Sequence, residues 1–414
     1  MTTEGGGSIS PDAEDALPAD GTSVAVPRQR SARRSTDVRI LFVPLPDEGR
    51  TSERTPTLYR LMRERFPVLG LPSPRDRLLY DPSRARLPRF LLYLVDKVLL
   101  FLRGVVIAHR FRTTVVFCET AHHAVAGLAI ARVLGIPCVW DSHGNGKLLY
   151  EALGKDRLSV RFVETLERFL GRRVNHLITV TDVDAAAYTS MGLPKEKVHV
   201  IPSCVSLREL DGGAPRPTEP DPIATPSLLL FGSFRYEPNR EALEFVNDRL
   251  APHLERLGVR CEIRIAGRGI PDLRFHPLVR ILGFVPDIYA CIREATVCIV
   301  PVRRGIGLLM KVIDSMAAGT PLVVFEFSTL GIPEIRHGVH AYVAATDEEF
   351  LEYVAEALAH PEAMRAMARH ARHLVEAKFD WDLYMDPLEA ILGGSKPVVA
   401  GGEGRAGRSY HVER

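Results

Sequence analysis

Two cations flank a short glycine turn late in the chain. Arg303 and Lys311 stand on either side of a Gly-x-Gly turn at 305–307, after an apolar run at 295–302 and before a helix-periodic stretch at 308–318. In a parallel sheet, the backbone amides of such a turn lie at the carboxyl ends of the strands and suit a phosphate. The two cations could join those amides on a diphosphate. An ordinary strand-to-helix crossover with surface charges would give the same pattern, so this alternative stays open.

Three further glycines come directly after apolar runs in the second half of the chain, namely Gly232, Gly267 and Gly283. A glycine lets a ligand approach the backbone where a side chain would block it. Each turn taken alone more often only connects a strand to the next element. Together, at the same end of successive strands, the turns indicate a nucleotide pocket. None belongs to a Gly-x-Gly-x-x-Gly pattern with an acid about 20 residues later, which disfavours a dinucleotide-dependent dehydrogenase.

Polar loops also follow two predicted strands in the first half of the chain. One loop carries Glu119, and the other, bracketed by glycines, carries His143. Both loops should open at the carboxyl edge of their sheet, where either side chain could transfer a proton. A purely structural hydrogen-bonding role explains His143 equally well. No Asp-x-Asp metal motif stands where a nucleotide could use it. We therefore expect no metal and no other cofactor, with the diphosphate charge met by cations and helix amides.

Alternating strands and helices must position these loops. In the first half, strands are expected at 38–45, 113–118, 137–140, 176–181 and 198–202, and helices at 124–134, 159–172 and 182–191. In the second half, strands are expected at 227–231, 261–266, 279–282, 296–302, 322–327 and 340–344, and helices near 240–257, 287–293, 308–318, 347–358 and 361–378. Such alternation predicts two doubly wound parallel sheets.

A polar stretch rich in Pro and Gly separates the two sets of elements and is interpreted as a linker. The expected order is a disordered tail at 1–36, a Rossmann-like domain at 37–205, the linker at 206–226, a second Rossmann-like domain at 227–380, a C-terminal helix at 381–395 and a flexible tail at 396–414. Two domains joined in this way would leave an interdomain cleft in which small ligands bind.

Composition narrows the class of protein. The 414 residues are 46% hydrophobic and 25% charged, which is typical of a soluble globular chain, and the net charge of +2 gives no reason to expect nucleic-acid binding. The six scattered cysteines and the lack of a secretory signal in residues 1–36 indicate a cytoplasmic protein. Three charges, Asp96, Lys97 and Arg103, interrupt the most apolar stretch, 90–108, so we interpret it as a core helix. Peripheral docking on a membrane through an apolar and basic face is the alternative.

Several of these segments resemble retaining glycosyltransferases of family 4. The run from Gly232 to Asn239, the turn Gly283-Phe284-Val285-Pro286-Asp287 and the segment 303–321 carry most of the resemblance; 178–181, 201–205 and 379–381 add to it. The motifs occur in the family's order and spacing, and the resemblance covers about residues 38–390. It implies the GT-B architecture, in which two Rossmann-like domains face each other and the C-terminal one holds most of a nucleotide-sugar donor.

The resemblance also implies roles for individual residues. The expected catalytic residues are Arg303, Lys311, Glu119 and His143, and the expected donor-binding residues are Gly232, Arg235, Gly283, Phe284, Gly305, Gly307, Leu308 and Asp314. Asp314 matches the second acid of the family's Glu-x7-Glu motif, which holds the ribose hydroxyls, whereas Ile306 occupies the place of the first acid. Asn239 stands where many members carry a lysine, and we interpret it as the N-cap of the helix that follows.

The implied activity is transfer of a sugar, with retention, from a nucleotide diphosphate sugar to an acceptor hydroxyl. A glycan, a lipid-linked sugar and a small natural product all remain open as acceptors, and no nucleic acid is expected as a partner. One alternative is a sugar-nucleotide epimerase or hydrolase of the same fold, with Glu119 or His143 as its base. Another is a non-catalytic GT-B partner subunit that lost its first acid at Ile306.

Overall fold

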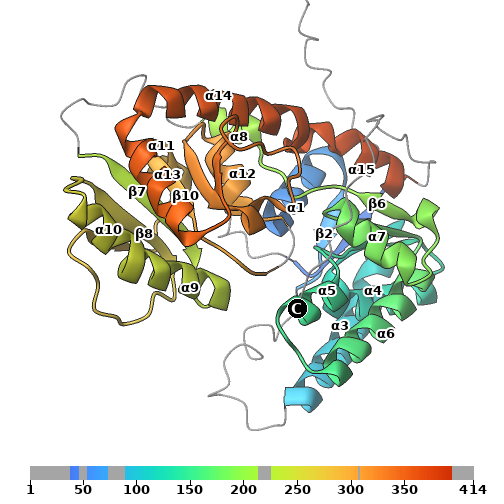
Figure 1. The fold of residues 1–414 in the computed structure, drawn as a ribbon. Coiled ribbons are helices and arrows are strands. Elements are labelled where there is room, and N and C mark those ends of the chain that lie inside the picture. The colour runs from blue at the N-terminus through green and yellow to red at the C-terminus, as the bar shows by residue number, and fades with distance from the viewer. Residues whose placement is uncertain (1–37, 46–53, 73–88, 213–224, 306–307, 394–414) are drawn as a thin grey trace, which may run out of the picture.

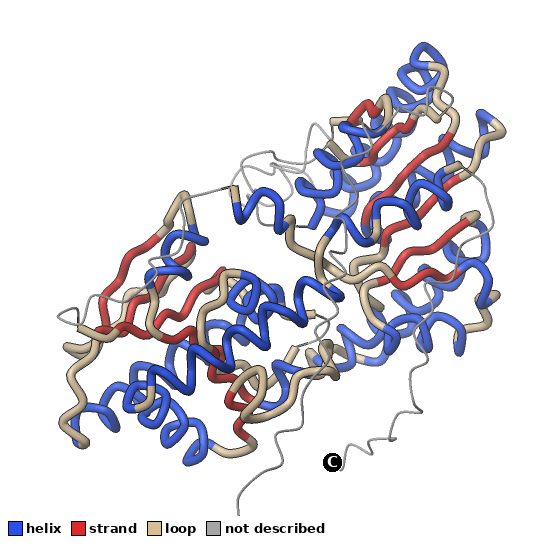
Figure 2. The backbone as a smooth tube through the Cα atoms, turned by 90° about the horizontal axis from the view of Figure 1, so that it is seen from above, coloured by secondary structure: helices blue, strands red, loops and turns tan. Residues whose placement is uncertain are grey.

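Two six-stranded, all-parallel sheets make up the protein, one in each half of the chain (Figure 1). The computed structural model describes residues 38–45, 54–72, 89–212, 225–305 and 308–393. Viewed from above, the strands of each sheet lie inside a lobe of helices (Figure 2). Every strand expected from the sequence has a counterpart, so the predicted doubly wound architecture is confirmed.

The first sheet has the order β2-β1-β3-β4-β5-β6. Its strands are β1 (Ile40–Val43), β2 (Val68–Gly70), β3 (Val115–Glu119), β4 (Cys138–Asp141), β5 (His176–Thr179) and β6 (Val198–Val200). The strand order reverses between β1 and β3, and in sheets of this kind ligands bind beyond the carboxyl ends of the strands at such a point. The edge strand β2 was not expected from the sequence.

Helices connect these strands and cover the first sheet. They are α1 (Arg54–Arg65), α3 (Arg89–Phe111), α4 (Thr120–Leu134), α5 (Gly146–Ala152), α6 (Arg157–Arg173) and α7 (Asp182–Ser190), with a 3₁₀ turn at Lys195–Lys197. The short helix α8 (Leu207–Asp211) follows and packs on the core of the second lobe. Asp156 caps α6 by accepting from the backbone N–H groups of Leu158 and Ser159, and Thr181 caps α7. The sequence did not predict α1 or α5, and α3 continues a few residues past the apolar stretch 90–108.

The second sheet has the order β12-β11-β10-β7-β8-β9, so its strand order reverses between β7 and β10. The strands are β7 (Ser227–Ser233), β8 (Glu262–Arg268), β9 (Val279–Gly283), β10 (Val297–Val300), β11 (Leu322–Phe325) and β12 (Tyr342–Ala344). The helices are α9 (Glu237–Phe245), α10 (Ala251–Arg256), α11 (Ile288–Glu294), α12 (Met310–Ala317), α13 (Asp347–Ala359) and α14 (Pro361–Lys378). A π-helical segment, Val246–Leu250, joins α9 to α10.

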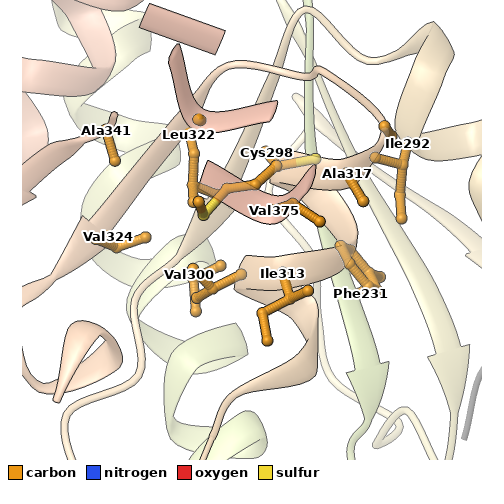
Figure 3. Close-up of a cluster of buried hydrophobic side chains, with 14 of the residues drawn as sticks. Phe231, Ile292, Cys298, Val300, Ile313, Ala317, Leu322, Val324, Ala341 and Val375 are labelled. Carbon is orange, nitrogen blue, oxygen red and sulfur yellow. The ribbon is translucent and has the colours of Figure 1, made fainter. Parts of the chain in front are cut away.

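Alternate side chains of the second sheet enter two different cores. On one face, Ile313 and Ala317 of α12 pack with Val375 of α14 against the strand residues Val300 and Leu322 (Figure 3). On the other face, α9, α10 and α13 cover the intervening strand residues. Burial of near-continuous Val, Ile and Leu runs on both faces is what a parallel sheet requires, and this core fixes α12 at the reversal point of the strands.

The chain crosses between the lobes twice, and the two crossing segments pair with each other. Cys204 belongs to the core of the first lobe, but Val205 belongs to that of the second. Phe379 and Trp381 make the return crossing in the same way, and the N–H of Trp381 donates to the carbonyl of Val205. The last helix, α15 (Met385–Leu392), therefore packs on the first lobe (Figure 1). The domain bounds expected from the sequence stay a prediction.

Candidate active site

The amine of Lys311 lies beside the glycine turn that ends β7. Its Nζ donates to Oδ1 of Asn239 over 2.6 Å, and a Cβ added to Gly232 would come within 3.2 Å of it. Lys311 is half-buried in the first turn of α12, and desolvation lowers its pKa to about 8. An ammonium group has three donors, so Lys311 can still donate to a ligand at the point where the strand order reverses.

Two glycines keep the ends of β7 and β8 bare. Gly232 and Gly267 pair across the two strands, with φ of 146° and 149°. A Cβ on Gly267 would lie 1.8 Å from the carbonyl oxygen of Gly232, so only glycine fits there. The backbone at this edge is therefore open to a ligand, as the sequence predicts for the carboxyl end of the sheet.

Asn239 is not a helix cap, and our interpretation of it was wrong. The helix α9 begins at Glu237 with Tyr236 in the capping position, and Asn239 lies inside the first turn. Its buried side chain donates to the carbonyl of Ser233 over 2.8 Å and accepts from Lys311. The amide thus fixes the Lys311 amine against the end of β7.

Asp314 lies one turn beyond Lys311 on α12 and is buried. Tyr289 of α11 donates its hydroxyl to Oδ1 of Asp314 over 2.8 Å. Burial raises the pKa of Asp314 to about 7, even though the Tyr289 hydrogen bond favours the carboxylate. Sequence reasoning did not find Tyr289, because an aromatic residue within a short helix gives no signal of its partner.

No hydrogen bond or ion pair joins Arg303 to Lys311 in the described part of the chain, and the two make these interactions with different residues. The guanidinium of Arg303 pairs with Asp347 at the start of α13 and stacks on the rings of Phe245 and Phe325, 4.7 and 4.3 Å from their centroids. Those rings belong to the core on the far side of the sheet from α12. The role of Arg303 at a diphosphate stays a prediction.

The turn before α12 is only partly described. Gly305 has φ of 134°, and a Cβ there would come within 2.8 Å of the hydroxyl of Tyr236. Ile306 and Gly307 lie outside the described residues. Leu308 is described but precedes the helix, which starts at Met310. The expected helix start at Leu308 is therefore slightly too early.

The remaining expected donor residues surround the ends of β7, β8 and β9. Phe284 is exposed, and Arg268 stacks on its ring at 4.0 Å. Gly283, just before it, has φ of 69° and faces open space. Gly269 brings its backbone close to the side chain of Arg235, since a Cβ there would lie 2.5 Å from Cγ of the arginine. This edge of the sheet thus presents cations and an exposed aromatic ring.

In the first lobe, the structure brings Glu119 and His143 together at the ends of β3 and β4. Nε2 of His143 lies 3.6 Å from Oε1 of Glu119 and 3.8 Å from Oδ2 of Asp141. Desolvation disfavours the imidazolium, but the neighbouring carboxylates outweigh it and raise the pKa of His143. Neither the buried Oε1 of Glu119 nor Nε2 of His143 has a hydrogen-bond partner among the described residues. The pair can therefore bind or protonate a ligand.

Left-handed backbone brackets this pair. Thr120 and His143, which follow the ends of the two strands, have φ of 55° and 59°. Such conformations are uncommon outside glycine and concentrate at functional sites. The polar loop that carries His143 rests on Glu167 of α6, which accepts from the N–H of Gly146 and from the hydroxyl of Tyr188. Burial raises the pKa of Glu167 to about 7.

Arg54 completes the site from α1, a helix that the sequence did not predict. Its guanidinium binds both carboxylate oxygens of Asp141, at 2.9 and 3.1 Å, and donates to the carbonyl of Pro202. Ligand atoms of Glu119, Asp141 and His143 lie within 4.8 Å of one another, as a metal site would need. Because Arg54 already supplies a cation to Asp141, this geometry favours an acid–base cluster over a metal centre.

Family comparisons decide what kind of protein carries this arrangement. Residues 21–204 match the model of the glycosyl transferase 4-like domain, and residues 225–360 match that of the glycosyl transferases group 1. The chain belongs to the group 1, family 4-like glycosyltransferases. The two matches take in both lobes, each with its cluster of polar residues. No curated protein sequence matches the chain.

Solved structures confirm the GT-B architecture of this glycosyltransferase. Sucrose-phosphate synthase from Thermosynechococcus elongatus is similar with a TM-score of 0.64 at 15% identity, covering 86% of this chain and 99% of that one. HepE of Anabaena, solved with UDP and glucose, gives 0.61 at 15% identity over 86% and 99% of the two chains. A glycosyltransferase from Rickettsia africae gives 0.59 at 13% identity over 87% and 98%. Within the described residues, no helix is long and apolar enough to cross a membrane.

Proposed function

We propose that the protein transfers a sugar from a nucleotide diphosphate sugar to an acceptor hydroxyl, with retention at the anomeric carbon. The position of the Lys311 amine carries this proposal, because it lies against the bare glycine turn of β7 where the strand order reverses. HepE, which shares the fold, has been solved with UDP-glucose, so a uridine diphosphate donor is the first to test.

Departure of a nucleoside diphosphate builds negative charge on its phosphate oxygens. Lys311 would stabilise that charge more strongly in the transition state than in the ground state, together with the amides that precede α12. Asp314 would accept from the ribose hydroxyls through the carboxylate oxygen that Tyr289 does not occupy. Phe284 and Arg235 would border the base, since both lie at the ends of β7 and β9.

Glu119 and His143 would act on the sugar and acceptor from the opposite lobe. Oε1 of Glu119 and Nε2 of His143 make no hydrogen bond among the described residues, so they can accept from or donate to sugar hydroxyls. The same pair is the observation that favours the second candidate function, an epimerase or hydrolase acting on sugar nucleotides, because either residue could serve as its base.

The full chain should be assayed with UDP-, GDP- and dTDP-sugars, with and without a panel of glycan and polyol acceptors. Transfer that appears only with acceptor, with the donor's anomeric configuration in the product, supports the proposal. Free or isomerised sugar, regardless of acceptor, supports the second candidate.

Lys311→Ala should lower kcat/KM roughly 10²-fold or more, as loss of one charge-assisted phosphate contact implies. Lys378→Ala, which removes an exposed lysine paired with Glu334, is the matched control. Wild-type turnover of Lys311→Ala would contradict the assignment.

A further inference from the structure

The helix α6 carries a row of exposed apolar side chains along its outer surface. Leu158, Phe162 and Phe169 are 80%, 69% and 48% exposed. Their spacing of four and seven residues places them in one line along the helix. The catalytic clusters do not use these side chains, and the inner surface of α6 already packs on the core through Leu170.

Arginines line one side of this apolar row. Arg157, Arg161, Arg168 and Arg172 are all exposed, and helical periodicity places them in a second row next to the first. None of them has a carboxylate partner among the described residues. Of the two acids of α6, Glu167 is buried under the polar loop, whereas Glu164 lies beside the arginine row but is half-buried and near Lys147. The exposed half of α6 is therefore both apolar and cationic.

The neighbouring helices extend this surface. On α3, Val98, Leu102 and Val106 recur at every fourth residue and are each about half exposed, whereas the acid Asp96 is buried. Arg103, Arg110 and Arg112 are exposed on or just after the same helix. The helix α4 packs against both α3 and α6, so the three form one layer over the first sheet (Figure 1). The helix α3 is thus a half-buried core helix, with Leu100 and Ala108 in the core and its other side exposed.

We propose that this outer face of α3, α4 and α6, the arginine–apolar face, docks on a lipid bilayer that contains anionic phospholipids. Leucine and phenylalanine can enter the boundary between headgroups and acyl chains while arginines bind lipid phosphates, which is how amphipathic helices lie in a membrane surface. A second copy of the chain fits less well. A two-fold contact would set the arginine rows against each other, with only the half-buried Glu164, which already lies near Lys147, as an acid of α6 beside them.

Vesicle co-sedimentation of the full chain tests the proposal. We expect binding to vesicles of equal parts phosphatidylcholine and phosphatidylglycerol, weaker binding to phosphatidylcholine alone, and loss of binding as salt is raised. Phe162→Ser/Phe169→Ser should weaken binding to the anionic vesicles at least tenfold. Arg161→Glu/Arg168→Glu should do the same and abolish the preference for the anionic vesicles.

Matched controls lie on the other lobe, where Arg256 and Leu257 are exposed on and just after α10. Arg256→Glu and Leu257→Ser should bind as the wild type does. Thermal melting shows whether each variant is folded, and sugar transfer from a soluble donor should be unchanged. Wild-type binding by either α6 double variant overturns the proposal. The proposal is also overturned if the wild type dimerises with increasing concentration but binds no vesicles, and the Phe162→Ser/Phe169→Ser variant no longer dimerises. That outcome would assign the face to a second copy of the chain.

Discussion

At the residue scale, the sequence could predict where Lys311 lies but not what surrounds it. The glycine turn and the helix start fix its place in the sheet, and the structure confirms that place. Its partner Asn239 was given another role, because a short polar residue near a helix start usually caps the helix. Tyr289 and Arg54 were not found at all. Each comes from an element far away in sequence, and single-chain patterns carry no information on such pairings.

The lowered pKa of Lys311 predicts how activity depends on pH. Because the free enzyme's pKa is about 8, the ammonium form is fully present below that pH and is lost above it. We expect kcat/KM for the donor to fall about tenfold per pH unit above pH 8. Lys311→Arg keeps the charge at all these pH values, so its profile should lack the descending limb even if its activity is lower. An unchanged limb in Lys311→Arg would assign the limb to another group.

The polar cluster of the first lobe predicts the response to chelators. Arg54 already meets the charge of Asp141, and Lys311 with helix amides would meet that of the diphosphate. Transfer should therefore persist after dialysis against EDTA, with kcat/KM within about twofold of the untreated enzyme. If activity is lost and only Mn²⁺ or Mg²⁺ restores it, the Glu119, Asp141 and His143 cluster becomes the metal site to mutate first.

At the element scale, long apolar strands were predictable and short edge elements were not. The strand β2 has three residues and half-buried side chains, so it gives no run that a pattern can detect. The helix α1 contains Pro56 and several charges, and α5 begins at Gly146, a poor helix former. These are the elements that bring Arg54 and the polar loop into the site. The missed helix α1 therefore accounts for the missed Arg54, whereas Tyr289 lies on α11, a helix that the sequence did predict.

The pairing of β7 with β8 makes a sharp stability prediction. Gly267→Ala would put a methyl group 1.8 Å from the carbonyl oxygen of Gly232, so the strand ends must separate. We expect a loss of at least roughly 3 kcal/mol in the free energy of unfolding, from steric strain and unfavourable φ together. Gly258→Ala is the control, because its φ of 68° is also left-handed but its Cβ would face open space. It should cost only about 1–2 kcal/mol. Equal losses in urea unfolding would mean that the strand contact is not the cause.

At the scale of the whole molecule, the sequence predicts two lobes, but not that the chain returns to the first one. Trp381 and α15 complete the core of the first lobe, although they follow the second lobe in sequence. The spacing of apolar residues in a helix is the same whether it packs on the nearest sheet or on the sheet of another lobe, so the sequence does not show which one it joins. The family resemblance implied two facing domains but not this return, and the buried ring of Trp381 packs the returning segment on the first lobe.

Arg54 is the residue that connects this crossing to the site. Its buried guanidinium binds Asp141 at the end of β4, donates to Pro202 beside the first crossing and stacks on Trp381 in the return crossing, 5.2 Å from the ring centroid. Removing the arginine takes both of its hydrogen bonds from the fully buried carboxylate of Asp141 and leaves it only the more distant His143. Arg54→Gln should therefore cost roughly 3–5 kcal/mol of the free energy of unfolding.

A double-mutant cycle on Arg54 and Asp141 shows how much of the stability lost in Arg54→Gln comes from the ion pair with Asp141 and how much from the other contacts of Arg54. Arg54→Gln/Asp141→Asn leaves no unpaired buried charge, so it should recover more than half of the loss, while the missing contacts to Pro202 and Trp381 account for the remainder. The matched control is the exposed pair of Arg208 and Glu64, which also links the crossing segment to α1. Arg208→Gln should cost less than about 1 kcal/mol, because solvent screens that pair. If both arginine variants unfold at the same denaturant concentration, the buried cluster does not hold the crossing, and Arg54 acts only on Asp141 and the chemistry beside it.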